Sequence, residues 1–106
     1  MVNRIKGIKI NWKDVAKERF REITAYLDEK WPPYVSEKFF SRTWFAIGCI
    51  EKNPGRYRPS ERTGIREAIL HGRCMLLYAV RNETEIEIIT FFETRQHPSK
   101  KFSGYQ

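Results

Sequence analysis

Cysteine and long apolar runs are both scarce in this chain. It has only two cysteines, Cys49 and Cys74, in 106 residues. That is too few for a disulfide framework, and we expect free, buried thiols in a reducing cytoplasm. No apolar run reaches the length of about 18 residues that a membrane span requires. The first residues also lack the apolar stretch and cleavage site of a secretory signal, so we predict a cytoplasmic protein.

The motifs of common enzyme classes are missing as well. The chain has no Gly-rich phosphate loop, HExxH, paired CxxC or GxSxG motif. Its two histidines and two cysteines do not have the spacing of a structural zinc site. Carboxylates are plentiful, but no pair of them is marked as catalytic. We therefore expect neither a metal ion nor a cofactor.

Positive charge is abundant. Lys and Arg number 20 against 13 Asp and Glu, so the net charge is +7 and the pI is about 9.6. A small protein this basic commonly meets a polyanion or an acidic partner; the alternative is a well-solvated, lysine-rich surface. Arginine, whose planar fork suits phosphate and carboxylate, is crowded into one segment. The candidate binding residues there are Arg56, Arg58, Arg62 and Arg66, and Arg95 near the end of the chain is a fifth.

The first third of the chain predicts one strand and one helix. Apolar and polar residues alternate from Ile8 to Trp12, which is typical of a strand. Apolar residues then recur at helical spacing and predict a helix over about 12–30, ended by the pair Pro32-Pro33. These helical positions are Ala16, Phe20, Ile23 and Leu27.

A second helix follows, with Ser36 as its expected N-cap and Asn53-Pro54-Gly55 as its end. The short connection predicts an antiparallel helix hairpin. The expected core-facing stripe of this helix consists of Phe39, Phe40, Trp44, Ile47 and Ile50. After it, Tyr57 is a candidate for a brief edge strand in an otherwise polar and basic segment.

The last third predicts three strands, at about 65–71, 73–81 and 85–93. Their connections are too short for a parallel return, so the strands form an antiparallel meander. With the helix hairpin on one face, the fold class is α+β in two layers. We expect a single domain over residues 1–98 and a mobile tail over 99–106, unless a partner orders that tail.

The meander brings residues distant in sequence to one edge of the sheet. His71 and Arg73 are expected there, together with Arg95 and His97 from the segment after the last strand. Histidine is an acid or base near neutral pH, and arginine binds phosphate, so this is the candidate catalytic set if the protein is a nuclease. The alternatives are a turn residue at His71, a solvated residue at His97 and an ion pair at Arg95. Arg66 is equally suited to tying the sheet to the helices.

In this order and spacing, the chain resembles the RelE/ParE superfamily, the toxins of bacterial type II toxin–antitoxin modules. The resemblance spans nearly the whole chain. It is carried by Trp12, Ile23, Tyr26-Leu27, Asn53-Pro54, Gly64-Ile65-Arg66, Leu77-Tyr78-Ala79-Val80, Ile86-Glu87-Ile88 and Thr94-Arg95-Gln96-His97-Pro98. The Arg-Gln-x-Pro ending is most similar to ParE-like, plasmid-stabilisation members.

The resemblance implies a cognate acidic antitoxin that wraps the toxin with an extended or helical segment. ParE-like members are described as poisoning DNA gyrase, and RelE-like members as cutting mRNA in the ribosomal A site. RelE-like nucleases carry a Tyr or His soon after the last strand, whereas the next tyrosine here is Tyr105. The resemblance therefore favours a gyrase inhibitor over a metal-free, ribosome-dependent endoribonuclease. A nucleic-acid-binding module without toxicity is a third interpretation.

Overall fold

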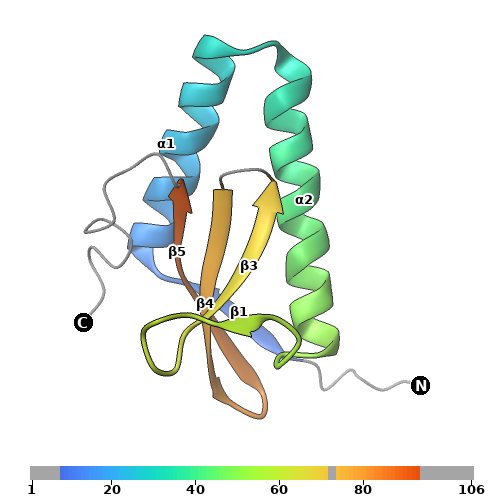
Figure 1. The fold of residues 1–106 in the computed structure, drawn as a ribbon, viewed down its shortest axis with the longest axis vertical. Helices are drawn as coiled ribbons and strands as arrows, with labels where there is room; N and C mark the ends of the chain where they lie inside the picture. The colour runs from blue at the N-terminus through green and yellow to red at the C-terminus, as the bar shows by residue number, and fades with distance from the viewer. Residues whose placement is uncertain (1–7, 72–73, 94–106) are drawn as a thin grey trace.

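The computed structural model describes residues 8–71 and 74–93, with His71 described through its backbone. Its elements follow the order strand, helix, helix and then four strands. The strands form one sheet in the order β1-β5-β4-β3-β2. Both helices lie behind this sheet in the view of Figure 1, and the predicted α+β class is confirmed.

The first strand, β1 (Lys9–Trp12), lies beside the last strand, β5 (Glu85–Glu93), and runs parallel to it. The alternating pattern predicted the strand but did not identify its partner. The register pairs Ile10 with Ile86 and Trp12 with Ile88. A backbone bond from the Lys13 N–H to the Ile88 carbonyl, 3.0 Å long, continues the contact to the start of the first helix.

The first helix, α1 (Asp14–Lys30), matches its predicted extent to within two residues at its start. Asp14 in the first turn and Lys30 in the last turn both suit the helix dipole. Ala16 is fully buried, while Phe20, Ile23 and Leu27 are partly buried against the core. The helix ends at Trp31, whose N–H bonds to the Leu27 carbonyl, just before the two prolines.

The second helix, α2 (Pro33–Lys52), begins earlier than predicted, and the expectation that Ser36 caps it was wrong. Pro33 occupies the first turn, where a proline is pre-organised for a helix and its missing N–H costs nothing. Ser36 lies one turn inside the helix, and its hydroxyl donates back to the Pro33 carbonyl at 3.2 Å. The helix ends before Asn53, as expected.

The aromatic stripe of α2 is only partly in the core, which corrects the sequence prediction. Phe39, Ile47 and Ile50 are buried, but Phe40 is 39% exposed and Trp44 is 55% exposed. These two rings lie on the flank of α2 that faces α1 rather than the sheet. Phe40 stacks on Phe20 with 5.3 Å between centroids, and Trp44 rests 5.9 Å from Trp12.

The predicted meander is confirmed. It consists of β3 (Arg66–His71), β4 (Cys74–Asn82) and β5, with antiparallel pairing at both junctions. In the β4–β5 turn, the Asn82 side-chain oxygen accepts from the Thr84 N–H at 2.9 Å. A two-residue strand, β2 (Arg58–Pro59), pairs with the start of β3. The expected brief edge strand therefore exists, one residue after Tyr57.

The sheet is apolar on both faces. Leu76 and Tyr78 on β4 belong to the cluster under the helices. Met75, Leu77 and Ala79 alternate with them and form a second buried cluster with Ile89 and Phe92. Strands buried on both faces read as continuous apolar runs, which explains the unbroken apolar run from Cys74 to Val80.

Tyr78 joins the sheet to the end of α2. Its side chain is fully buried, and its hydroxyl donates to the Pro54 carbonyl at 2.7 Å. Burial raises the pKa of this phenol above its usual value. The bond anchors the segment that follows α2 to the centre of the sheet.

We expect Tyr78→Phe to lower the free energy of unfolding by about 1–2 kcal/mol, because the Pro54 carbonyl loses its partner inside the protein. Urea denaturation followed by circular dichroism measures this change. Tyr34→Phe is the matched control, since Tyr34 is 66% exposed. Equal unfolding midpoints for the Tyr78 variant and the native chain would contradict the assigned role.

Candidate functional site at the strand ends

The end of β3, the start of β4 and the end of β5 meet at one place. Cys74 pairs with His71 on one side and with Glu93 on the other. Of the residues predicted at this edge as the catalytic set, His71 is described, and its backbone lies at this end of the sheet. Arg73, Arg95 and His97, the other members of the predicted catalytic set, lie outside the described residues, so this set stays a prediction.

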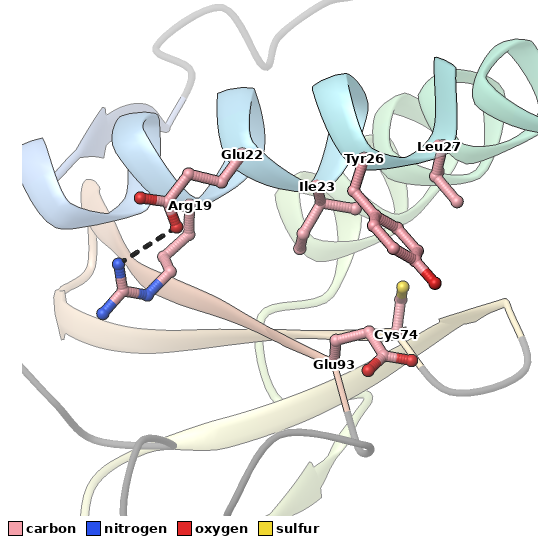
Figure 2. A pocket seen from close by; sticks show the side chains of 7 residues that line it. All are labelled: Arg19, Glu22, Ile23, Tyr26, Leu27, Cys74 and Glu93. Carbon is pink, nitrogen blue, oxygen red and sulfur yellow. Dashed lines mark hydrogen bonds and ion pairs between the residues drawn. The ribbon is translucent and has the colours of Figure 1, made fainter. Parts of the chain in front are cut away.

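A groove of about 410 Å³ opens beside these strand ends, between them and α1. Figure 2 shows Tyr26 and Ile23 projecting from α1 toward Cys74 and Glu93. The groove is lined by Arg19, Glu22, Ile23, Tyr26, Leu27, Cys74 and Glu93. The Arg19 guanidinium is directed at the Glu22 carboxylate, with 3.3 Å between Nη1 and Oε1.

The chemistry of this groove is mixed. Ile23 and Leu27 provide an apolar wall, while Glu22 and Glu93 place two carboxylates at its rim. The Arg19 guanidinium offsets the charge of Glu22, and the apolar wall can accept a side chain from a protein partner. No motif in the sequence identified Tyr26, Cys74 and Glu93 as groove residues. Their only signal was the meander register, which places Cys74 between His71 and Glu93.

The two cysteines are free thiols, as expected. Both are half-buried rather than buried, which corrects the sequence expectation. Cys74 is half-buried because it lines the groove at the strand ends. Cys49 lies on α2 near Tyr57. Burial and a side-chain bond from Cys49 raise the pKa of the Tyr57 phenol.

Of the five candidate binding arginines, Arg95 lies outside the described residues, and two of the other four have structural partners. The Arg58 Nε lies 3.0 Å from the carboxylate of Glu67, a side chain that is only 6% exposed. Arg66 Nη1 donates to the Tyr57 carbonyl at 2.7 Å. The pairing of β2 with β3 sets both contacts, since it places Arg58 opposite Glu67 and Pro59 opposite Arg66.

The other two arginines are exposed. The Arg56 guanidinium lies over the Tyr57 ring at 5.6 Å from its centroid. Arg62 lies in the turn before β3, where its N–H bonds to the Ser60 hydroxyl at 3.0 Å. The pairing of β2 with β3 brings Arg58 and Arg66 onto adjacent strands, while Arg56 and Arg62 lie in the segments that flank β2.

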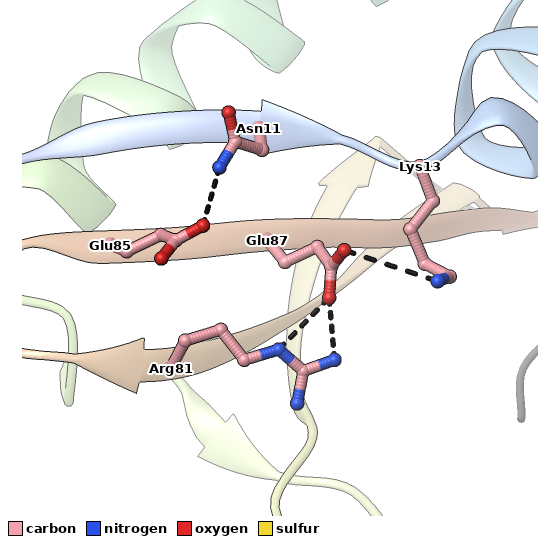
Figure 3. A network of polar contacts seen from close by, with 5 residues as sticks. All are labelled: Asn11, Lys13, Arg81, Glu85 and Glu87. Carbon is pink, nitrogen blue, oxygen red and sulfur yellow. Dashed lines mark hydrogen bonds and ion pairs between the residues drawn. The ribbon is translucent and has the colours of Figure 1, made fainter.

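A charged network lies on β1, β5 and β4, away from the groove. Glu87 accepts from Arg81 Nε at 2.9 Å and from Nη2 at 2.5 Å, and Lys13 lies 3.9 Å away. The Asn11 amide donates to Glu85 at 2.6 Å. Figure 3 shows these side chains along one side of β5. Because its carboxylates are paired within the protein, we read this network as support for the β1–β5 junction.

Within residues 8–71 and 74–93, no group of three His, Cys, Asp or Glu side chains could hold a metal ion. In the same part of the chain, neither helix is apolar and long enough to cross a membrane. The expectation that no metal or cofactor is needed stays a prediction.

The fold is shared with solved toxin structures. The chromosomal ParDE system from P. aeruginosa aligns with a TM-score of 0.69 and 20% identity, covering 83% of this chain and 97% of that chain. The RelBE2 toxin–antitoxin complex from Mycobacterium tuberculosis aligns with a TM-score of 0.56 and 21% identity, covering 82% of this chain and 98% of that chain. A copper-bound mutant toxin from Helicobacter pylori aligns with a TM-score of 0.54 and 13% identity, covering 83% of this chain and 96% of that chain. At these identities, the likeness establishes the fold.

The family model for the ParE toxin of the type II toxin–antitoxin system parDE matches residues 10–98. The match covers most of the chain, which therefore belongs to the ParE toxin family. A comparison with curated proteins finds no significant match. The resemblance stated from the sequence is confirmed at the level of the family.

We expect Arg66→Ala to destabilise the protein by about 1–2 kcal/mol, because the Tyr57 carbonyl loses a charged donor in a partly buried position. Arg56→Ala is the control and should change stability by no more than about 0.5 kcal/mol, since its guanidinium is exposed. Thermal and urea unfolding measure both variants. If the two variants were equally stable, Arg66 would have no structural role and would return to the candidate binding set.

Proposed function

We propose that this chain is the toxin of a type II toxin–antitoxin module, that it inhibits DNA gyrase and that a cognate acidic antitoxin neutralises it. The observation that carries the proposal is its membership of the ParE toxin family over residues 10–98. Gyrase inhibition needs a complementary protein surface and no acid–base pair. The ribosome-dependent mRNA endoribonuclease is the alternative on the same fold.

The groove at the strand ends supports the choice of a protein target. A nuclease must bring the phosphate chain of its substrate to its acid and base and stabilise charge on phosphorus. Here an apolar wall and the paired charges of Arg19 and Glu22 border the described part of the strand ends. A protein could place an apolar side chain against Ile23 and Leu27.

The antitoxin part of the proposal is supported by charge. The net charge of +7 and the exposed Arg56 and Arg62 favour an acidic partner. Attraction between opposite charges accelerates encounter and is screened by salt. The same attraction would operate whichever target the toxin has.

Two purified assays separate the targets. We expect the chain to inhibit gyrase supercoiling and to leave mRNA intact on translating ribosomes. The double variant His71→Gln with His97→Gln should keep most of its toxicity, since acid and base groups typically contribute about 10²–10⁴-fold each only in a nuclease. Cells that express the toxin alone should arrest growth and show broken DNA.

The opposite pattern would reverse the choice of target. Cleavage of mRNA by the native chain, loss of cleavage in the double variant and unchanged supercoiling would together establish the endoribonuclease. Circular dichroism of the double variant shows whether it is folded. Absence of growth arrest and of both activities would refute the toxin assignment itself.

We also expect a tight 1:1 complex with an acidic protein encoded beside this chain. Its association rate should fall steeply as ionic strength rises, because long-range attraction to the basic toxin is screened. Stopped-flow fluorescence of the tryptophans at low and high salt measures this rate. A rate independent of salt would show that charge does not guide the encounter.

A further inference from the structure

The outer surface of α2 carries aromatic and basic side chains in alternation. Successive residues turn by about 100° around a helix axis. One arc of about 100° therefore contains the residues that we call the α2 track. They are Tyr34, Lys38, Ser41, Arg42, Phe45, Cys49 and Lys52.

The rings of the track face solvent. Tyr34 is 66% exposed and Phe45 is 69% exposed, although large apolar side chains are normally buried. Lys38, Arg42 and Lys52 are exposed as well. α2 contains two acidic residues, Glu37 and Glu51. Around the helix axis they lie about 80° and about 120° away from Phe45. The track thus presents cations and aromatic faces without a carboxylate of its own.

A hollow of about 480 Å³ adjoins the middle of the track, between α2, Tyr57 and the end of β3. Phe45 and Tyr57 bring aromatic rings to it, and Arg42 brings a guanidinium. Arg42 Nη1 donates to the Leu70 carbonyl at 3.3 Å, which holds the planar group at the hollow. Beyond the hollow, Arg56 lies over the Tyr57 ring and extends the basic and aromatic surface past the end of α2.

From these observations we propose that the α2 track and the adjoining hollow bind single-stranded nucleic acid, with bases stacked on Phe45 and Tyr34 and phosphates paired with Lys38 and Arg42. Exposed aromatics interleaved with cations are the features of sequence-independent single-strand binding. The track spans about 27 Å from Tyr34 to Lys52, which accommodates several nucleotides. This surface is separate from the groove at the strand ends and goes beyond the proposed function.

The shape of the surface favours a nucleic acid over an acidic protein. A partner helix would need a continuous apolar groove, whereas the track follows the outside of α2 and the apolar residues Ala46, Ile69 and Leu70 are confined to the hollow at its middle. A single strand is flexible enough to follow that side and to place one base in the hollow. Its phosphates also match the arginine fork.

Fluorescence anisotropy with labelled oligonucleotides of about ten nucleotides, oligo-dT and oligo-U, tests the proposal on the full chain. We expect binding that weakens steeply between low and moderate salt. Phe45→Ala should weaken binding by about 5- to 100-fold through the loss of one stacked base. Phe45→Tyr should keep it, because the ring remains.

Matched controls lie on α1. Tyr26→Ala removes an exposed ring outside the track, and Arg21→Gln removes an exposed cation there; both should leave the affinity nearly unchanged. Arg42→Gln should reduce the slope of log affinity against log salt by about 0.7, the value for one phosphate contact on a single strand. Circular dichroism confirms that each variant is folded.

Three outcomes would overturn the proposal. One is no binding of either oligonucleotide. The second is that Phe45→Ala and Tyr26→Ala weaken oligonucleotide binding equally, or that neither variant weakens it. The third is that a ten-residue poly-glutamate peptide binds as tightly as the oligonucleotides, which would indicate that the surface recognises charge alone. None of these results bears on growth arrest or gyrase inhibition, so the proposed function is tested separately.

Discussion

The parallel pairing of β1 with β5 is the constraint on which the rest of the structure depends. Because the two strands are far apart in sequence and run in the same direction, the helix hairpin must cross over between them. That crossing places α1 over β5 and buries Phe20 against Phe91, with 5.2 Å between centroids. The strand β5 is then hydrogen-bonded on both sides. Ile86, Ile88 and Ile89 on it are fully buried.

The groove at the strand ends is a consequence of this arrangement. Because α1 starts directly after β1 and runs across β5, its later turns reach the place where β3 and β5 end and β4 begins. Ile23 and Tyr26 face the groove from the helix, and Cys74 and Glu93 face it from the sheet. The groove therefore combines residues from three elements that no local pattern in the sequence connects.

Charge is divided unevenly between the surfaces of the protein. On β1, β4 and β5 the carboxylates of Glu85 and Glu87 are engaged by side chains of the chain itself. On α2, in contrast, Lys38 and Lys52 share an arc with exposed rings and without a carboxylate. The α2 track therefore carries positive charge with no carboxylate in the same arc. This favours partners with negative charge at that surface.

The elements themselves were predictable from local chemistry. The pair Pro32-Pro33 ends one helix, and the same Pro33 starts the next, because proline suits the first turn and no later one. Short turns after His71 and Asn82 allow only antiparallel neighbours, so the meander followed directly. The sequence allowed Arg66 to tie the sheet to the helices, whereas in the structure its guanidinium bonds to the Tyr57 carbonyl, in the segment between α2 and β2.

Tertiary packing alone decided which apolar residues are buried. Phe39, Phe40 and Trp44 all fit one helical stripe, yet only Phe39 enters the core, since α2 is covered by the sheet on one side and by α1 on a narrow flank. The β1–β5 pairing, the groove around Cys74 and the exposure of Phe45 have the same origin. The periodicity of the sequence predicts on which face of a helix or strand a side chain lies. Whether that face is buried depends on neighbours that come from segments distant in the sequence.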